Sequence, residues 1–341
     1  MENVTLGKTG IAVNKNGFGA LPIQRIPENE AVYLLHRAYA GGITFFDTAR
    51  FYTDSEEKIG KAFRGMRDKV IIASKTMAQD ASGFLRDLET TLEKLQTDYL
   101  DIYQFHNPGF CPKPDDKSGL YEAMAGAVAK GYVRHIGITN HRLTVAREAV
   151  DSGLYETLQF PFCYLSGKRE RELVRKCKTN NMGFIAMKAL SGGLITNSAA
   201  AYAFFGQYKN ALPIWGIQRP EELDEFLEYA ISPPPMNPRL VAFISQERKA
   251  LRGDFCRGCG YCMPCPAGIE ISNCARMSLL LRRSPAALQL TTEVQQKMKK
   301  TKDCTLCNRC KKRCPYGLDT PALLKKNYED YRNVLAGKTI V

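Results

Sequence analysis

The sequence predicts an α/β protein built from a (β/α)8 barrel and a small cysteine-rich C-terminal domain, and two patterns support this prediction. Over residues 1–230, short β-branched or aromatic runs alternate with longer amphipathic stretches. In the last quarter of the chain, eight of the twelve cysteines fall into two short runs. With 341 residues, 44% of them hydrophobic, the chain can bury a substantial core and exceeds the usual size of one domain.

The alternating pattern predicts eight β-strands, each followed by a helix. The strands are expected at Phe18–Ala20, Thr44–Asp47, Val70–Ser74, Leu100–Phe105, Val133–Ile138, Leu158–Phe160, Phe184–Met187 and Leu212–Trp215. Helices are expected between them, for example at Glu30–Ala40, Gly83–Leu95, Leu120–Lys130 and Pro220–Ala230. Eight such repeats in this length of chain match a (β/α)8 barrel.

A proline cluster separates the barrel from the rest of the chain. The prolines at 233, 234 and 235 end the last barrel helix, and a linker helix at about Pro238–Leu251 leads to the first cysteine run. The predicted domains are residues 1–231 for the barrel, 232–252 for the linker and its helix, and 253–341 for the cysteine-rich domain.

Both cysteine runs have three cysteines at x2 spacing and a fourth that is followed by proline. The second run has the C-x2-C-x2-C-x3-C-P form typical of bacterial ferredoxins, and the first is one residue shorter before its fourth cysteine. In such pairs, the fourth cysteine of each run usually ligates the cluster of the other run. The sequence therefore predicts a ferredoxin-like domain with two 4Fe–4S clusters. The expected ligands are Cys256, Cys259, Cys262 and Cys314 for one cluster, and Cys304, Cys307, Cys310 and Cys265 for the other.

Zinc and disulfides are the alternatives for these cysteines. Structural zinc sites also use Cys-x2-Cys steps, but they require neither the third cysteine nor the proline after the fourth. Disulfides are disfavoured because no signal peptide is visible at the N-terminus, which predicts a cytoplasmic protein with reduced thiols. We expect the iron–sulfur protein to act in a low-oxygen setting. The other cysteines have no partner pattern and are expected to be small buried residues: Cys111, Cys163, Cys177 and Cys274.

The formal net charge is +13, and much of the basic excess lies beside the cysteines. Two oxidised clusters with their thiolates would lower this charge to roughly +9. The basic side chains favour an acidic electron-transfer protein, such as a ferredoxin or flavodoxin, as a partner. No nucleic-acid-binding motif accompanies them, so we expect no nucleic-acid partner. No apolar run approaches the roughly 20 residues that a membrane span needs.

Chemically active side chains stand where three predicted strands end, and the active sites of such barrels lie at those ends. Asp47, Lys75 and His106 end strands two, three and four, and Tyr52 lies in the loop after Asp47. Tyrosine is ordinarily a poor acid at neutral pH. An adjacent lysine held by a carboxylate stabilises the phenolate, and a histidine can share the proton. The four residues therefore predict a proton-donating catalytic site.

The segments that carry these residues resemble the aldo-keto reductase family. They are Gly42–Ala49 with Tyr52, Ser55 and Glu56, then Ile71–Thr76, and Leu100–His106. The resemblance covers residues 5–230, and with the cysteine runs the whole chain resembles the subgroup that has a fused C-terminal ferredoxin domain. It implies that Tyr52 is the general acid. It also implies that Lys75 and Asp47 tune this acid and that His106 orients the substrate carbonyl.

The resemblance also implies a nicotinamide cofactor, NADP(H) or NAD(H). The matching positions are Thr139, Asn140 and Gln159 for the nicotinamide amide, Gly216, Gln218 and Arg219 for the phosphate-binding turn, and Glu225 for adenine. The chain departs from the family at Met187 and Lys188, which stand where an aromatic residue commonly stacks on the nicotinamide. It also has Glu222 where NADP-dependent members often have an arginine, and Phe226 in place of a common asparagine. A carboxylate there is expected to repel a phosphate, with Arg219 compensating.

We therefore expect an oxidoreductase that reduces or oxidises a small molecule of the carbonyl class, coupled to electron transfer through the clusters. Hydride transfer moves two electrons and each cluster passes one, so FMN in the same barrel is an alternative cofactor. Lys188, Lys75 and Arg219 would then supply positive charge to the flavin and its phosphate. A second alternative is a non-catalytic electron-transfer subunit with a vestigial barrel. Substrate specificity is expected to reside in the loops at 107–117 and 191–209, and no motif in these loops identifies a substrate.

Overall fold

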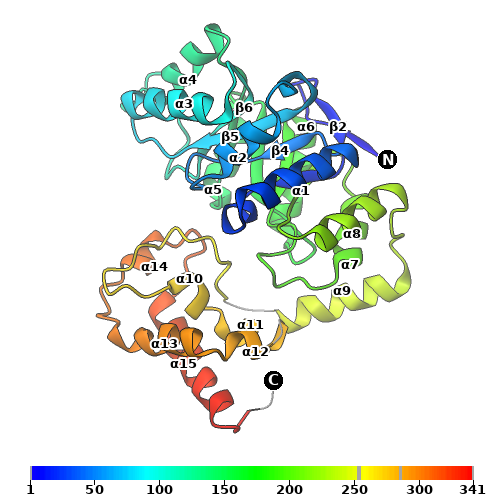
Figure 1. Cartoon of the computed structure of the whole chain (residues 1–341). Coiled ribbons are helices and arrows are strands. Elements are labelled where there is room, and N and C mark those ends of the chain that lie inside the picture. Colours follow the sequence, from blue (N-terminus) through cyan, green and yellow to red (C-terminus); the bar gives the residue numbers. More distant parts are fainter. Residues whose placement is uncertain (1, 252–254, 284–285, 340–341) are drawn as a thin grey trace. The chain divides into compact units, whose positions relative to one another are not determined.

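The predicted barrel is confirmed by the computed structural model, which describes residues 2–251, 255–283 and 286–339. Eight parallel strands close on themselves in the order β10-β3-β4-β5-β6-β7-β8-β9, inside a layer of helices (Figure 1). Their bounds are β3 Gly17–Gly19, β4 Phe45–Asp47, β5 Ile71–Thr76, β6 Leu100–His106, β7 Val133–Thr139, β8 Thr157–Pro161, β9 Gly183–Met187 and β10 Ala211–Gly216. Each strand overlaps the run predicted for it.

The barrel helices follow the strands in the predicted order. They are α1 Glu28–Ala40, α2 Ser55–Ala62, α3 Ala81–Leu95, α4 Leu120–Ala129, α5 Leu143–Ser152, α6 Lys168–Thr179, α7 Ser198–Gly206 and α8 Pro220–Ile231, with short 3-10 turns at Pro22–Arg25 (η1) and Arg67–Lys69 (η2). Local sequence fixes several of their ends. The Asp80 carboxylate accepts a 2.7 Å hydrogen bond from the Gly83 N–H at the start of α3, and Gly153, with φ 69°, ends α5.

A hairpin that the sequence did not predict closes the N-terminal end of the barrel. It consists of β1 Asn3–Thr5 and β2 Ala12–Asn14, which pair antiparallel. Val4, Leu6 and Val13 are buried in one apolar cluster with residues of the barrel strands. Gly7 has φ 52°, and a Cβ there would lie 2.4 Å from the Asn181 carbonyl oxygen, so this close approach requires glycine. The functional site is therefore expected at the other end of the barrel, at the C-terminal ends of the strands.

The chain divides into two compact units. The barrel unit extends to Ala189 and resumes at Ala199–Ile244, whereas Leu190–Ser198 and the chain from Ser245 onward form the second unit. The linker helix α9 is observed at Pro238–Ala250, so the division falls inside it. The predicted domain junction at 252–253 lies outside the described residues. The grouping of the loop after β9 with the cysteine-rich unit was not predicted.

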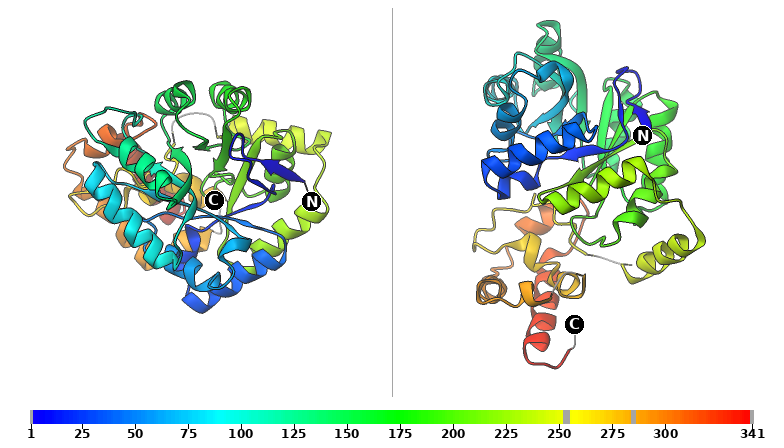
Figure 2. Two further views of the ribbon diagram at one scale, coloured as in Figure 1. Left: turned by 90° about the horizontal axis from the view of Figure 1, so that it is seen from above. Right: turned by 45° about the vertical axis from the view of Figure 1, so that its right-hand side comes forward.

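The cysteine-rich unit is a set of short helices around α15, as the two views of Figure 2 show. Its elements are α10 Ile271–Cys274, α11 Met277–Arg283, α12 Ala286–Gln289, α13 Thr292–Lys299, η3 Lys300–Asp303, α14 Arg309–Arg313 and α15 Thr320–Leu335. Ile269, Met298 and Leu324 form its apolar core together with Cys256 and Cys310. In the part of the chain that the structure describes, no helix is both long and apolar enough to cross a membrane.

Candidate functional site

A buried ion pair lies at the C-terminal ends of neighbouring strands β4 and β5. The Lys75 ammonium is 2.8 Å from the Asp47 carboxylate and also donates a 2.5 Å hydrogen bond to the Thr48 carbonyl oxygen. Lys75 is only 1% exposed. Gln159 donates to the same Asp47 oxygen at 3.3 Å. The paired ammonium is therefore held in a fixed position with little solvent around it, which strengthens its field.

Tyr52 lies against this ion pair and against His106. The Lys75 Nζ is 5.2 Å from the centroid of the Tyr52 ring, and the Tyr52 and His106 rings meet edge to face with centroids 5.9 Å apart. Tyr52 is partly exposed, whereas His106 is buried. The structure therefore brings together all four residues that the sequence predicted as catalytic, with the phenol on the solvent side.

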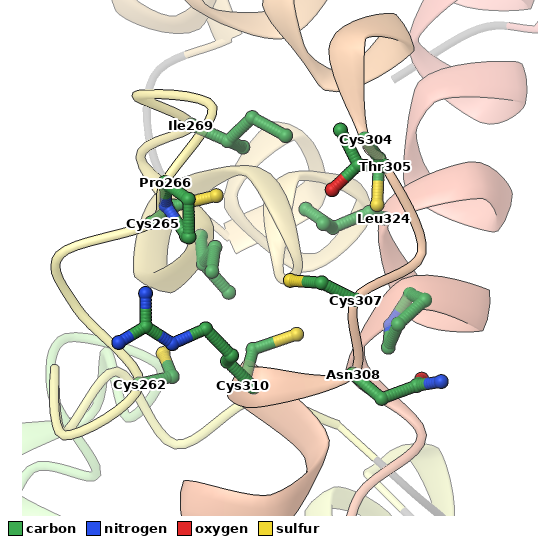
Figure 3. A pocket seen from close by; sticks show the side chains of 13 residues that line it. Cys262, Cys265, Pro266, Ile269, Cys304, Thr305, Cys307, Asn308, Cys310 and Leu324 are labelled. Carbon is green, nitrogen blue, oxygen red and sulfur yellow. The ribbon is translucent and has the colours of Figure 1, made fainter.

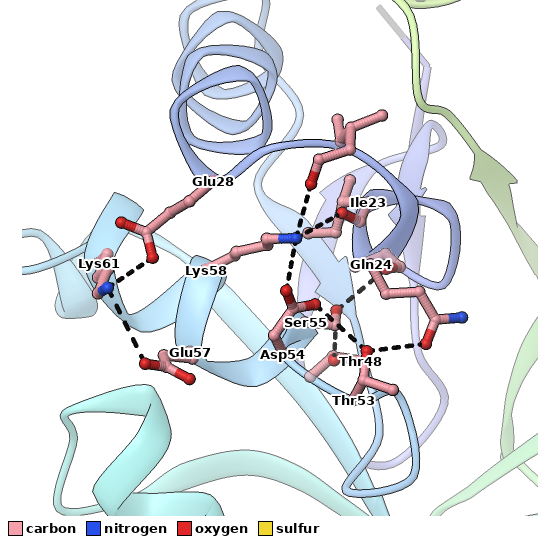
Figure 4. A network of polar contacts seen from close by, with 12 residues as sticks. Ile23, Gln24, Glu28, Thr48, Thr53, Asp54, Ser55, Glu57, Lys58 and Lys61 are labelled. Atoms are coloured by element: carbon pink, nitrogen blue, oxygen red, sulfur yellow. Dashed lines mark hydrogen bonds and ion pairs between the residues drawn. The ribbon is translucent and has the colours of Figure 1, made fainter.

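A polar network holds the loop that carries Tyr52 (Figure 4). The Thr48 hydroxyl donates to Ser55 at 2.9 Å, and the Ser55 hydroxyl donates to the Ala20 carbonyl at 3.0 Å. The buried Lys58 ammonium donates to the Ile23 carbonyl at 3.0 Å. These bonds tie both ends of the loop to the segment that follows β3. A catalytic side chain on a loop gains positional precision from such anchoring.

Burial controls the protonation of the charged groups around Tyr52. It lowers the pKa of Lys75, which Asp47 opposes, and it raises the pKa of Asp47, which Lys75 opposes. Burial, together with the positive charge of Lys75, lowers the pKa of His106 to about 3. The imidazole is therefore neutral at physiological pH. It can donate a hydrogen bond to a carbonyl oxygen, but it does not act as a cationic acid.

The three residues expected to hold the nicotinamide amide lie beside this group and are engaged internally. The Asn140 side chain donates to the Pro108 carbonyl at 2.9 Å and accepts from the Arg142 N–H at 2.7 Å. The Gln159 side chain links Asp47 to Gln104. The Thr139 hydroxyl contacts the Met187 sulfur at 3.7 Å. To bind to these side chains, the amide group of a nicotinamide would have to replace their internal hydrogen bonds.

His141 is a site residue that sequence reasoning missed. It is buried two residues beyond the end of β7, and its backbone N–H donates to the Asn107 side chain at 3.0 Å. Burial lowers its pKa well below the ordinary value, and the positive charge of Lys188 lowers it further. His141 and Lys188 therefore belong to the same electrostatic environment as His106. The rule that identified His106, a polar residue at a strand end, gives Thr139 and Asn140 for β7, and His141 would have been found only by extending it into the loop.

The turn between β10 and α8 is closed by an acidic side chain. The Glu222 carboxylate accepts from the backbone N–H groups of Gln218 and Arg219 at 3.0 and 3.2 Å, and it forms an ion pair with the Arg219 guanidinium at 2.8 Å. The exposed Glu225 accepts from Tyr229 at 3.0 Å, and Gly216 is also exposed. The N–H groups of Gln218 and Arg219, which are expected to hold a cofactor phosphate, are thus bound by the Glu222 carboxylate of the chain itself.

The cysteine-rich unit contains two cavities, each lined by cysteines of both runs. The first cavity is lined by Cys256, Cys259, Cys262 and Cys314. The second is lined by Cys265, Cys304, Cys307 and Cys310, with Cys262 also at its wall (Figure 3). These sets are the two groups of four that the spacing predicted, with the fourth cysteine exchanged between the runs.

The donor chemistry of both cavities suits iron–sulfur clusters. Each offers four thiols in a mainly apolar wall, with Ile271 shared between them. Burial raises the pKa of Cys262 to about 12, whereas the Arg309 backbone N–H lowers the pKa of Cys307. Four soft thiolates in apolar surroundings are the ligand set of 4Fe–4S clusters. The four cysteines outside the runs are all buried, as expected: Cys111, Cys163, Cys177 and Cys274.

Comparisons with known proteins agree with both halves of the structure. Residues 15–202 match the Aldo/keto reductase family, and residues 255–319 match the 4Fe-4S dicluster domain. The chain is 28% identical over 226 residues to Aldo-keto reductase YhdN of Bacillus subtilis, covering 60% of this chain and 67% of that protein. It is 30% identical over 217 residues to L-galactose dehydrogenase of Arabidopsis thaliana, covering 58% and 67%.

Solved structures give the same fold. The thermostable aldo-keto reductase Tm1743 in complex with the inhibitor epalrestat superposes with a TM-score of 0.60 at 26% identity, covering 72% of this chain and all of that one. An aldo-keto reductase from Klebsiella pneumoniae in complex with NADPH superposes with a TM-score of 0.62 at 24% identity, covering 72% and 94%. Both likenesses concern the barrel.

Proposed function

Because the chain belongs to the aldo/keto reductase family and carries a C-terminal 4Fe-4S dicluster domain, it is an oxidoreductase, and we propose that it reduces a small carbonyl compound, or oxidises the corresponding alcohol, with electrons from its clusters. Reduction of a carbonyl takes two electrons and two protons. Two clusters together hold two transferable electrons, so one fully reduced chain carries enough for one turnover.

The position of Tyr52 beside the Lys75–Asp47 ion pair is the observation that carries this proposal. The phenol donates a proton to the carbonyl oxygen as negative charge develops there, and the fixed ammonium stabilises the phenolate that remains. His106, as a neutral imidazole at 5.9 Å from the Tyr52 ring, orients the same oxygen by hydrogen bonding. The buried ion pair needs no reorganisation during the reaction, which favours catalysis.

A nicotinamide cofactor in the barrel is part of the proposal, and when bound it would pass the two electrons that the clusters supply to the carbonyl as one hydride. The relative from Klebsiella pneumoniae is in complex with NADPH, which supports NADP(H) as the cofactor, and the residues of this chain that match cofactor positions include Thr139, Gln159 and Gly216 near the ends of β7, β8 and β10. The Glu222 carboxylate, which accepts from the N–H groups of the β10–α8 turn, would repel a 2′-phosphate there and weaken the preference for NADP(H) over NAD(H). The flavin alternative finds no support among these relatives.

The eight cysteines at the two cavities are the proposed cluster ligands, in the two sets described above. When bound, the clusters would supply single electrons, which they would receive from an acidic electron-transfer protein. The basic side chains beside the second cysteine run support such a partner. The cytoplasmic, low-oxygen setting stays a prediction.

Coupling between the clusters and the barrel can be tested by rapid mixing. Protein prepared without oxygen is reduced with dithionite, freed of excess reductant, and mixed with a panel of aldehydes and ketones, with and without NAD⁺ or NADP⁺. We expect the iron–sulfur absorbance to recover at the rate of product formation for a substrate. If the absorbance stays flat while NAD(P)H alone supports turnover, the clusters are structural and the coupling is wrong.

A further inference from the structure

One edge of the second cavity lies at the surface of the cysteine-rich unit. Cys307 is exposed, and so are the four residues around it in Thr305–Arg309. Leu306 is 67% exposed, which is unusual for so large an apolar side chain. By contrast, Cys256 in the first cavity is only 9% exposed. Of the eight cysteines of the two runs, only Cys307 is exposed, so a group held in the second cavity would have one solvent-exposed ligand, at this edge.

Positive charge is concentrated in the segment that carries the second cysteine run. Residues 299–313 contain seven lysines and arginines and a single acidic residue, Asp303, which is an excess of six positive charges. The basic residues are Lys299, Lys300, Lys302, Arg309, Lys311, Lys312 and Arg313, and all are exposed. Among the described residues, the only ion pair that any of them forms is the 2.8 Å contact of Lys311 with Asp319. Most of this charge is thus available to a partner.

Compensation of cluster charge does not explain this distribution. Two 4Fe–4S clusters with four thiolates each carry the same charge, so compensation alone would place cations at both. The segment that carries the first run, residues 255–270, contains Arg257 as its one basic residue and Glu270 as its one acidic residue. The positive excess is therefore carried by the segment of the second run, which lines the second cavity through Cys304, Cys307 and Cys310 and the first only through Cys314.

The chain itself packs against the wall of the first cavity. Arg276 donates a 2.8 Å hydrogen bond to the Gly192 carbonyl oxygen in the loop Leu190–Ser198. A Cβ at Gly192 would lie 3.6 Å from the carbonyl oxygen of Arg257, a residue that lines the first cavity. Arg283 holds the same loop through the Leu194 carbonyl at 2.8 Å. This loop occupies space beside the first cavity that a partner would otherwise reach.

We propose that an acidic one-electron carrier protein docks on the exposed edge of the second cavity and that electrons enter the chain there. We call this surface the Cys307 face, and it consists of Thr305–Arg309 together with Lys299, Lys300, Lys302, Lys312 and Arg313. This inference rests on the proposed binding of clusters. It identifies the cluster of the second cavity as the one that receives an electron first. The donor loses one electron and the cluster of the second cavity gains one, with no bond formed or broken.

The Cys307 face has the composition of a transient electron-transfer surface. The lysines and arginines steer an acidic carrier to it, which raises the association rate at low salt. Leu306 lies between these cations in the sequence and is exposed. It supplies an apolar contact to the partner, and the strength of this contact does not depend on charge. A small apolar centre with a charged rim permits fast binding and fast release, as repeated single-electron deliveries require.

The test measures electron transfer into the complete, cluster-loaded protein without nicotinamide or carbonyl. An acidic flavodoxin in its fully reduced form is the probe, and its oxidation and the bleaching of the clusters are followed by stopped flow. The test variant carries Lys299→Glu, Lys312→Glu and Arg313→Glu. We expect its second-order rate constant to fall at least about tenfold at low ionic strength. At about 1 M salt, where the Debye length is roughly 3 Å, the difference from the wild type should nearly vanish.

A matched control separates the face from overall charge. Lys69→Glu, Lys130→Glu and Lys178→Glu make the same change in net charge at exposed barrel positions, and this variant should keep the wild-type rate. Leu306→Ala should slow transfer at both low and high salt. Dithionite should bleach the clusters to the same final extent in every variant, which shows that the clusters are intact.

The proposal is overturned if the control variant slows as much as the test variant, if the test variant does not slow, or if the flavodoxin reduces no cluster. None of these outcomes involves the barrel chemistry. A protein that accepts electrons at this face but reduces no carbonyl would contradict the proposed function and leave this inference standing.

Discussion

The Lys75 ammonium lies 2.8 Å from the Asp47 carboxylate and 5.2 Å from the centre of the Tyr52 ring. Lys75 thus connects a residue that ends one strand with a residue in the loop beyond it. Because Lys75 and Asp47 are both buried, their positions do not depend on solvent, and Tyr52 is the member of the group that a substrate can reach.

Replacing the Tyr52 hydroxyl tests the acid directly. Tyr52→Phe keeps the ring against His106 but removes the proton donor, so carbonyl turnover should fall by roughly 10²–10⁴-fold with little change in cofactor affinity. Steady-state rates and a cofactor titration measure the two quantities. Tyr33→Phe, which removes an exposed hydroxyl on α1, is the control and should change neither. Near-normal turnover of Tyr52→Phe would refute the proposed mechanism.

The cysteine assignment predicts the metal content. Protein purified without oxygen should contain about eight iron and eight sulfide per chain. Cys307→Ala should lose about half of both, because it removes one ligand of the second cavity. Cys111→Ala, a substitution of a buried cysteine in the barrel unit, should lose none. Stoichiometric zinc without sulfide would exclude the cluster assignment.

The low pKa of His106 predicts how barrel stability depends on pH. The folded-state pKa is about 3, whereas an unfolded histidine titrates near 6.5, so the unfolded chain binds the proton more readily. The free energy of unfolding therefore falls as the pH drops below about 6.5. Between pH 7.5 and 5.5 the contribution of His106 should be a loss of about 1.4 kcal/mol.

Urea titrations at the two pH values measure this loss. The single tryptophan, Trp215, is 0% exposed in the barrel, so its fluorescence reports the unfolding of that unit. His106→Gln should show a pH dependence smaller by that amount, while the contribution of His141, which has the same sign, remains in both proteins. An identical pH dependence in both would show that His106 is not held neutral.

The carboxylate at the β10–α8 turn predicts cofactor preference. Glu222→Gln keeps an acceptor for the N–H groups of Gln218 and Arg219 but removes the negative charge. Affinity for NADPH should then rise on the order of tenfold relative to NADH, because the repulsion of the 2′-phosphate is gone. Calorimetric titration with both nucleotides provides the ratio. Glu221→Gln, which neutralises the preceding exposed residue, should leave the ratio unchanged; an equal shift there would point to a general charge effect.

Much of the barrel could be predicted because its signals are local. The strands alternate with helices along the chain, and each strand pairs with its neighbour in sequence, so a pattern of runs is enough to order the sheet. The same regularity is enough to place Asp47, Lys75 and His106 at one end of the barrel, because each of them is the last or the next-to-last residue of a parallel strand. The β1–β2 hairpin escaped prediction because its strands are three residues long and carry no clear period.

By itself, the sequence determined the fold class, the residues at the strand ends and the grouping of eight cysteines into two sets, since each follows from spacing along the chain. Only the tertiary structure decided which of these groups meet solvent. Cys307 is exposed and Cys256 is buried although both occupy x2 motifs, and Asn140 and Gln159 are engaged internally although both match cofactor positions. The physical reason is that exposure and hydrogen bonding depend on contacts with segments distant in sequence. The spacing of residues along the chain does not reveal those contacts.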